Sequence, residues 1–193
     1  MSNGLEIERK FLISYPDTAF LDALRDCSKV EIEQTYLSDR SRIRKWRENG
    51  KTVYIKTIKE KISEITRIET ESEIEKAEYE RLFLLRDESR ATIKKTRYRY
   101  PYLGKIIEID LFPFWSDLAF LEVELESEDE RFSIPPFIEV IREVTEDRRY
   151  RNSALAKEIP YDTAIDLMQN KYNIFFIHSY FLSYCFVTNI CEI

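Results

Sequence analysis

Two glutamates and a lysine stand at every second position near the start of the chain, in Glu6-Ile7-Glu8-Arg9-Lys10. The apolar run Phe11-Leu12-Ile13 follows directly. In a β-strand successive side chains point to opposite faces, so Glu6, Glu8 and Lys10 would share one face. Carboxylates on such a face can hold a metal ion, and an ammonium can hold an anion. A single charged face is also ordinary where an antiparallel sheet meets water, so the pattern has to be followed along the chain.

The same alternation of charged and other residues recurs in six later segments. They are Arg42-Ile43-Arg44, residues 53–59, residues 67–71, Lys95-Thr96-Arg97, Glu108-Ile109-Asp110 and Glu122-Val123-Glu124. One interpretation is a set of solvated sheet faces with ion pairs across the strands. The other is that helices cover the outside of the sheet, so that roughly eight strands close into a barrel with a polar lumen.

If the charged faces turn inward, the lumen combines many carboxylates with many cations. Its members would be Glu6, Glu8, Glu69, Glu71, Glu108, Asp110, Glu122 and Glu124 beside Lys10, Arg42, Arg44, Lys59, Arg67, Lys95 and Arg97. Enclosed charge is costly unless it is paired or binds something. Clustered carboxylates are hard oxygen ligands that suit Mg²⁺ or Mn²⁺. Several converging Arg and Lys groups match the oxygens of a polyphosphate, so the two sets together predict a metal ion and an oligophosphate.

The composition of the chain argues against several classes of function. The 193 residues are 44% hydrophobic, enough for one sizeable domain. The net charge of −6 argues against a nucleic-acid partner, and three glycines leave no Gly-rich phosphate loop. The lone histidine, His178, disfavours a zinc site or a His dyad. Cys27, Cys185 and Cys191 have no paired spacing, which predicts free thiols and a cytoplasmic protein.

The elements that must position these residues follow from hydrophobic periodicity. Strands are predicted at 5–13, 32–37, 40–47, 52–59, 65–73, 91–99, 105–112 and 119–127, with a short strand or extended segment at 138–145. Asn49-Gly50 predicts a hairpin turn. A helix is predicted at 17–25, with Phe20, Ala23, Leu24 and Cys27 on one side, and another at 75–87, with Ile74, Ala77, Leu84 and Leu85 on one stripe. Further helix is predicted at 154–157 and 162–171. The predicted fold class is α+β. If the charged faces turn inward, it is an eight-stranded antiparallel β-barrel with a polar lumen and with helices packed outside.

One domain is expected over residues 1–170, followed by an aromatic-rich extension at 171–193. From Ile174 onward the chain is dominated by Phe, Tyr, Ile and Leu and contains no Lys or Arg. Its unbroken apolar portion is shorter than the roughly 20 residues that a membrane span needs. We expect this segment to pack on the body or on a partner, with membrane contact and a poorly ordered end as alternatives.

The charged segments resemble a known family. Residues 6–10 match the E-x-E-x-K signature of the CYTH superfamily, the triphosphate tunnel metalloenzymes, and the similarity extends over about residues 4–160. Later matches are Gln34-Thr35-Tyr36-Leu37, Arg42-Ile43-Arg44, Thr57-Ile58-Lys59, Arg67 with Glu69 and Glu71, Lys95-Thr96-Arg97-Tyr98, Glu108-Ile109-Asp110, Glu122-Val123-Glu124 and residues 144–152. Residues after about 170 match nothing in the family.

The resemblance implies an eight-stranded antiparallel triphosphate tunnel with two divalent ions. The substrate would be bound by Lys10, Arg42, Arg44, Lys59, Arg67, Lys95, Arg97 and Arg149. The metal ions would be bound by Glu6, Glu8, Glu122 and Glu124, assisted by Glu108 and Asp110, and Lys59, Glu69 and Glu71 would serve the catalytic step. One ion would neutralise the phosphates, and the second would lower the pKa of the attacking water.

Members of this family cyclise ATP, hydrolyse thiamine triphosphate or cleave inorganic triphosphate, so the fold alone does not choose among them. Similarity to small bacterial members favours a metal-dependent inorganic triphosphatase with a small-molecule substrate. A class IV adenylate cyclase, a thiamine triphosphatase and a non-catalytic module that binds polyphosphate or nucleotides remain as alternatives. Trp46 either stacks on an organic group of the substrate or is a packing residue. The number of subunits stays open, and a homodimer is compatible with the sequence.

Overall fold

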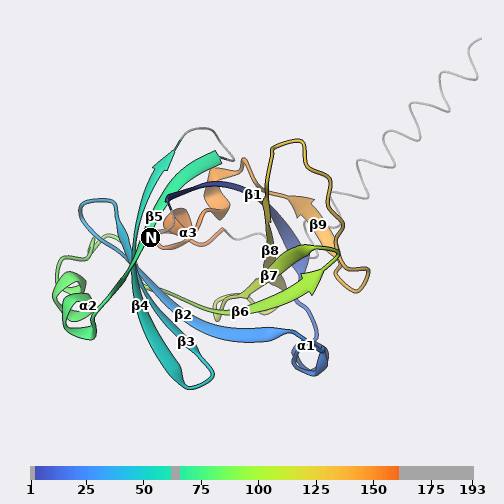
Figure 1. The fold of residues 1–193 in the computed structure, drawn as a ribbon, viewed down its shortest axis with the longest axis horizontal. Coiled ribbons are helices and arrows are strands. Elements are labelled where there is room, and N and C mark those ends of the chain that lie inside the picture. The colour runs from blue at the N-terminus through green and yellow to red at the C-terminus, as the bar shows by residue number, and fades with distance from the viewer. Residues whose placement is uncertain (1–2, 62–65, 161–193) are drawn as a thin grey trace, which may run out of the picture. The chain divides into compact units, whose positions relative to one another are not determined.

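The computed structural model describes residues 3–61 and 66–160, which lie in one compact unit (Figure 1). Its elements are β1 (Asn3–Ser14), α1 (Thr18–Ala23), β2 (Ser28–Tyr36), β3 (Arg42–Glu48), β4 (Lys51–Lys61), β5 (Thr66–Ile74), α2 (Lys76–Phe83), β6 (Ile93–Tyr102), β7 (Lys105–Leu111), β8 (Leu118–Leu125), β9 (Val140–Glu143), the 3₁₀ helix η1 (Arg148–Tyr150) and α3 (Asn152–Leu155). Across these ranges, no helix is both long enough and apolar enough to cross a lipid bilayer. The predicted helix at 162–171, the boundary at 170 and the extension at 171–193 lie outside the described residues.

The described strands form one antiparallel sheet in the order β5-β4-β3-β2-β6-β7-β8-β1-β9. All eight predicted strands are present, and the ambiguous segment at 138–145 contains β9. β1 pairs with β8 along one edge and with β9 along the other. Its first half also pairs with β5, from Asn3 opposite Thr70 to Ile7 opposite Thr66. Strands from the two ends of the order therefore lie side by side (Figure 1).

Two hairpins turn on pairs of residues with positive φ. Asn49 and Gly50, with φ of 49° and 77°, join β3 to β4, and Leu103 and Gly104, with φ of 47° and 82°, join β6 to β7. Two successive positive φ angles are what a type I′ turn requires, and its twist matches that of the flanking strands. The predicted Asn49-Gly50 hairpin is confirmed.

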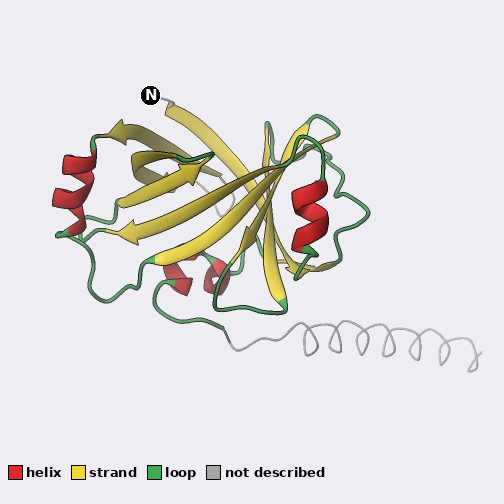
Figure 2. Ribbon diagram, turned by 90° about the horizontal axis from the view of Figure 1, so that it is seen from below, coloured by secondary structure: helices red, strands yellow, loops and turns green. Residues whose placement is uncertain are grey.

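The main hydrophobic core lies on the face of the sheet opposite to the charged residues. Ile7, Ile109 and Val123, from β1, β7 and β8, are buried there in one cluster with Leu21 of α1. Asp17 begins α1 by accepting hydrogen bonds from the backbone N–H groups of the first turn. Since this outer face is covered by α1 and neighbouring loops, the alternate residues of the same strands face inward (Figure 2).

A second cluster lies under α2, on the outer face of β3 and β4. Ile43 of β3 is completely buried against Tyr79 and Leu82 of the helix. Both α1 and α2 therefore pack outside the sheet, as predicted from the sequence (Figure 2).

The predicted apolar faces of these two helices are confirmed only in part: Leu24 and Cys27 pack against the main core and Ile74 packs against the cluster under α2, but other members are exposed. Leu84 is 76% exposed and Leu85 is 54% exposed, because α2 ends at Phe83 and the 3.6-residue period no longer applies beyond it. In α1 the buried residue is Leu21, whereas Phe20 is 45% exposed. A helix of six residues makes fewer than two turns, so its apolar period is poorly defined.

Candidate functional site

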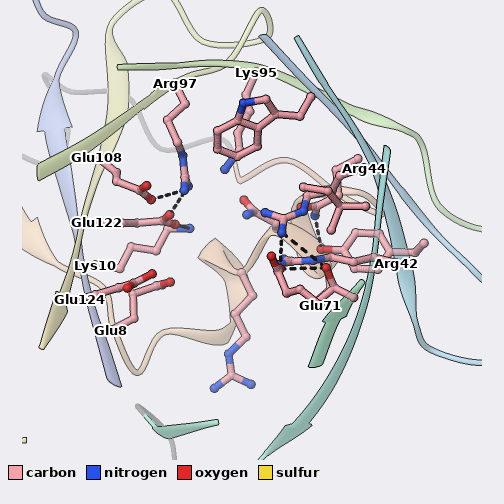
Figure 3. Close-up of a pocket in the computed structure, with 18 of the residues that line it drawn as sticks. Glu8, Lys10, Arg42, Arg44, Glu71, Lys95, Arg97, Glu108, Glu122 and Glu124 are labelled. Atoms are coloured by element: carbon pink, nitrogen blue, oxygen red, sulfur yellow. Dashed lines mark hydrogen bonds and ion pairs between the residues drawn. The ribbon is translucent and has the colours of Figure 1, made fainter. Parts of the chain in front are cut away.

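The inward faces of the strands line a cavity of about 740 Å³ (Figure 3). It brings together ten of the residues predicted from the sequence: Glu8, Lys10, Arg42, Arg44, Glu71, Lys95, Arg97, Glu108, Glu122 and Glu124. They come from β1, β3, β5, β6, β7 and β8. The charged residues of separate strands thus face one shared space.

Carboxylates gather where β1, β8 and β7 run side by side, and we call Glu8, Glu108, Glu122 and Glu124 the acidic wall. Glu8 lies directly opposite Glu124 in the β1–β8 ladder, and Glu122 lies opposite Glu108 in the β7–β8 ladder. Figure 3 shows the carboxylates of Glu8 and Glu124 next to each other. Like charges directly opposite on neighbouring strands destabilise a sheet, so this wall needs positive charge nearby.

Arg97 supplies part of that charge. Its guanidinium donates to Asp110 from Nε at 2.6 Å and from Nη2 at 2.7 Å, and it also pairs with Glu108 and Glu122. Burial disfavours a charge on Arg97, but these carboxylates outweigh it and raise the pKa of Arg97 well above its ordinary value. Arg97 therefore stays cationic and links Glu108 and Glu122 of the acidic wall to Asp110.

Lys10 pairs with the same wall. Its Nζ lies 2.8 Å from Oε1 of Glu122, and both side chains are less than one-tenth exposed. Burial of Glu122 favours the protonated acid, but the charges of Lys10, Arg97 and Lys95 outweigh it and hold the pKa of Glu122 well below its usual range. Glu122 is thus an ionised carboxylate inside the protein.

Asp110 lies behind the cavity surface. It is completely buried and accepts hydrogen bonds from both Lys95 and Arg97. It is not among the residues that line the cavity. Burial, followed by the charge of Arg97, lowers the pKa of Lys95, and the Asp110 carboxylate opposes that shift. Asp110 therefore holds two cavity cations in place, whereas its predicted role as a metal ligand would need its carboxylate at the cavity surface.

Arginines of β3 form the opposite side of the cavity, and we call Arg42 and Arg44 the basic wall. Both converge on Oε1 of Glu71: Arg44 pairs with it directly, and Nη2 of Arg42 lies 3.8 Å away. Thr57 donates to the same oxygen at 3.0 Å. One carboxylate oxygen thus lies among three donor groups, which is an environment that suits a phosphate oxygen equally well.

Three further arginines line the cavity but were not predicted: Arg40, Arg99 and Arg151. Arg99 continues the alternation of Lys95 and Arg97 by one more step, so the sequence did contain a signal for it. Arg40 lies in the β2–β3 turn and Arg151 directly precedes α3, where no two-residue period exists. Gln34, Tyr36, Trp46 and Thr57, which belong to inward strand faces, also line the cavity.

The structure does not bring Arg149 to the cavity. Its side chain is 59% exposed, and its Nη2 donates to Asp147 at 2.7 Å. That hydrogen bond lowers the pKa of Asp147. Arg151, two residues later, is the arginine of this segment that lines the cavity.

Four predicted residues have side chains outside the described part of the protein: Glu6, Lys59, Arg67 and Glu69. Their strands place Glu6 opposite Arg67 and Lys59 opposite Glu69. These backbone positions agree with the predicted strand faces, and the roles of the four residues stay predictions.

The acidic wall provides the donors that a divalent metal ion prefers. Within residues 3–61 and 66–160, no three Asp, Glu, His or Cys side chains converge as a complete metal site would. Mg²⁺, however, is commonly held by one or two carboxylates together with waters and substrate phosphates. The directly opposed Glu8 and Glu124 fit that requirement, because an added cation relieves their repulsion.

The fold and the cavity together define a class of proteins in which an antiparallel sheet carries a cavity of mixed charge on its inner face. The model of the CYTH domain family matches residues 4–150 of this chain. The chain belongs to the CYTH domain family, as the E-x-E-x-K signature indicated.

Two curated relatives cover most of the chain. The inorganic triphosphatase of Nitrosomonas europaea is 37% identical over an alignment of 164 residues that covers 80% of this chain and 99% of that protein. The inorganic triphosphatase of Acetivibrio thermocellus is 35% identical over an alignment of 164 residues that covers 82% of this chain and 96% of that protein. The crystal structure of an inorganic triphosphatase matches with a TM-score of 0.51 and 36% identity, over 80% of this chain and 96% of that one.

Proposed function

We propose that this protein is a divalent-metal-dependent hydrolase that cleaves a phosphoanhydride bond of inorganic triphosphate. The observation that carries the proposal is that the acidic and basic walls face one cavity (Figure 3). A linear triphosphate carries several negative charges, and it can engage cationic side chains and a metal ion at once. The names of the two curated relatives support inorganic triphosphate as the substrate.

We also propose that β1 to β8 close into an eight-stranded antiparallel barrel, the triphosphate tunnel. The pairing of β1 with β5 supports closure, because these strands stand at or near opposite ends of the sheet order. β9 then lies outside the ring, paired to β1 alone. Closure would leave no free edge among the eight strands and would hold both walls at fixed positions.

In this proposal the basic wall binds the phosphate oxygens. Arg42 and Arg44 present forks of donors that match a phosphate, and a phosphate oxygen takes over the contacts that Glu71 now receives. Lys10 binds a second phosphate from the side of the acidic wall. Because these groups hold the chain of phosphates in one orientation, hydrolysis depends on positioning and charge stabilisation more than on a covalent nucleophile.

The acidic wall, with Glu8 and Glu124 at its centre, would hold Mg²⁺ or Mn²⁺, which supplies charge neutralisation at the phosphates and activation of water. A site for two ions, the catalytic roles of Lys59, Glu69 and Glu71, and the contact of Arg67 with the substrate complete the proposal. The cytoplasmic location stays a prediction from the thiol content.

Phosphate release tests the proposal directly. The purified protein should hydrolyse inorganic triphosphate with Mg²⁺ or Mn²⁺ and lose this activity when EDTA removes the ions. ATP and thiamine triphosphate should be poorer substrates under identical conditions. Saturable binding of triphosphate without turnover would instead identify a non-catalytic binding module.

A second candidate substrate class is a triphosphate that carries an organic group. Trp46 of β3 lines the cavity beside Val53 of β4, directly opposite it in the ladder. An indole next to an aliphatic side chain can stack on a nucleoside or on thiamine. If Trp46→Ala reduces kcat/KM for ATP or thiamine triphosphate but leaves inorganic triphosphate unaffected, this second candidate is supported.

Arg44→Ala should weaken substrate binding more than it weakens the fold. Loss of a charge-assisted hydrogen bond is worth about 1.5–3 kcal/mol, so KM for triphosphate should rise about 10- to 100-fold. Arg47→Ala is the matched control, because Arg47 lies on the same strand but is exposed and pairs with Glu31 at 2.6 Å. Equal KM values for the two variants would show that Arg44 does not bind the phosphate groups.

Arg151→Ala and Arg149→Ala form a second matched pair. Both residues belong to one short segment, but only Arg151 lines the cavity. We expect Arg151→Ala to raise KM for triphosphate about tenfold, as for the loss of one charge-assisted contact. Arg149→Ala should leave KM close to the wild-type value. If steady-state kinetics instead show a larger increase in KM for Arg149→Ala than for Arg151→Ala, Arg149 is the residue that binds the substrate.

A further inference from the structure

The inward faces of β1 and β8 change from charged to apolar residues at the same level, and the chain does the same just beyond the end of β7. Along these faces Glu8 and Lys10 are followed by Leu12, Glu108 and Asp110 by Phe112, and Glu124 and Glu122 by Phe120. The β1–β8 ladder aligns the change, because Lys10 lies opposite Glu122 and Leu12 lies opposite Phe120. On β7 the change comes one pair later, because Asp110 is still opposite Phe120. The charged layer of the cavity therefore lies directly on an apolar layer.

Aromatic rings fill that apolar layer, and we call Phe112, Trp115, Phe120 and Tyr150 the aromatic floor. Phe120 and Tyr150 are completely buried, Phe112 is 2% exposed and Trp115 is 8% exposed. The Phe120 ring contacts the other three edge to face, at centroid distances of 5.5 Å to Phe112, 5.1 Å to Trp115 and 6.0 Å to Tyr150. Such packing fixes the orientation of the Phe120 ring.

The ammonium of Lys10 lies over this ring. Its Nζ is 3.8 Å from the centroid of Phe120 and 2.8 Å from Oε1 of Glu122. A lysine side chain is long and flexible, and its ammonium is normally held by several waters. Here the negative face of the Phe120 ring contacts the ammonium on one side, and the Glu122 carboxylate contacts it on another. The remaining donor directions are thereby restricted.

We propose that Phe120 is a positioning residue for Lys10: its ring face holds the ammonium at the level of the charged layer, where a phosphate oxygen of the substrate can reach it. This inference rests on the proposed function, in which Lys10 binds a phosphate. The sequence motifs do not predict this role for Phe120, because a phenylalanine on a strand is usually a residue of the hydrophobic core.

Phe112 provides a matched comparison. It is also a buried phenylalanine of the aromatic floor, but its ring lies 6.0 Å from the Nζ of Lys95, at the limit of a cation–π contact. Phe112→Leu and Phe120→Leu thus remove similar packing, whereas only Phe120→Leu removes a close contact to an ammonium. A purely structural role predicts the same kinetic change for both variants.

Phe120→Leu should raise KM for inorganic triphosphate about 5- to 30-fold, the range expected for a desolvated cation–π contact, with a much smaller change in kcat. Phe112→Leu should raise KM clearly less while lowering the melting temperature to a similar extent. Phe120→Tyr retains the ring and should restore KM towards the wild-type value. Equal KM increases for the two leucine variants, or no rescue by tyrosine in a folded protein, would overturn the proposal.

A spectroscopic measurement tests the contact without relying on activity. With ¹³C-labelled lysine, the ε-methylene signal of Lys10, assigned by its loss in Lys10→Met, should be shifted upfield by the ring current of Phe120. The shift should disappear in Phe120→Leu and persist in Phe120→Tyr and Phe112→Leu. A wild-type signal at the usual lysine position would refute the contact, whereas absence of triphosphate turnover with the shift present would refute only the proposed function.

Discussion

Glu124→Gln is expected to abolish most of the metal-dependent hydrolysis of triphosphate while leaving the fold intact. Loss of a group that only supports a metal ligand typically lowers metal affinity or activity about 10- to 100-fold. Loss of a ligand itself should therefore reduce kcat/KM by at least about 100-fold. Glu8→Gln should act in the same way, because Glu8 and Glu124 lie directly opposite each other and line the same cavity.

The same substitution should also remove the stabilisation that a bound metal ion gives the folded protein. In the wild type, Mg²⁺ or Mn²⁺ should raise the melting temperature by linkage to binding, and this increase should be lost in Glu124→Gln.

Glu126→Gln is the control for both measurements. Glu126 follows Glu124 by two residues but lies beyond the end of β8, is exposed and does not line the cavity. Its amide variant should keep wild-type turnover and the metal-induced increase in melting temperature. Wild-type turnover in Glu124→Gln would count decisively against a metal site on the acidic wall.

The strands and most of the cavity could be predicted because both depend on a period of two. Arg42 and Arg44 share a face whatever lies around them, and a one-residue slip would have placed Ile43 in the cavity and the arginines in the core under α2. Hydrophobic burial of Ile43 therefore fixes which face the charges occupy. The Asn49-Gly50 turn fixes the register of the next strand in the same local way.

The rest of the site could not be predicted because it depends on irregular backbone. Arg149 and Arg151 are chemically identical and two residues apart, and only the 3₁₀ turn η1 decides which of them reaches the cavity. Likewise, Asp110 has the spacing of a cavity residue, but its depth depends on the long side chains of Lys95 and Arg97 that cover it. The spacing of residues along a strand predicts which face each side chain lies on. It does not predict how deeply that side chain is buried.

Asp110→Asn is expected to cause the largest loss of stability among single substitutions in the charged cluster. Asp110 is completely buried and accepts hydrogen bonds from Lys95 and from two nitrogens of Arg97. Removing one partner from a buried ion pair typically costs about 3–5 kcal/mol, because the remaining charges stay buried without compensation. For a protein of this size, the melting temperature should fall by about 6–20 °C.

Glu31→Gln is the control, since Glu31 pairs with Arg47 at 2.6 Å on the surface with both side chains about half exposed. An exposed pair of this kind is worth at most about 1 kcal/mol, so the melting temperature should change little. The comparison also separates two roles for Asp110. A metal ligand at the cavity surface would lose metal affinity at little cost to metal-free stability, whereas a buried counter-ion would lose stability in EDTA. Thermal unfolding of Asp110→Asn in EDTA at the wild-type temperature would therefore contradict the buried counter-ion and favour the metal ligand.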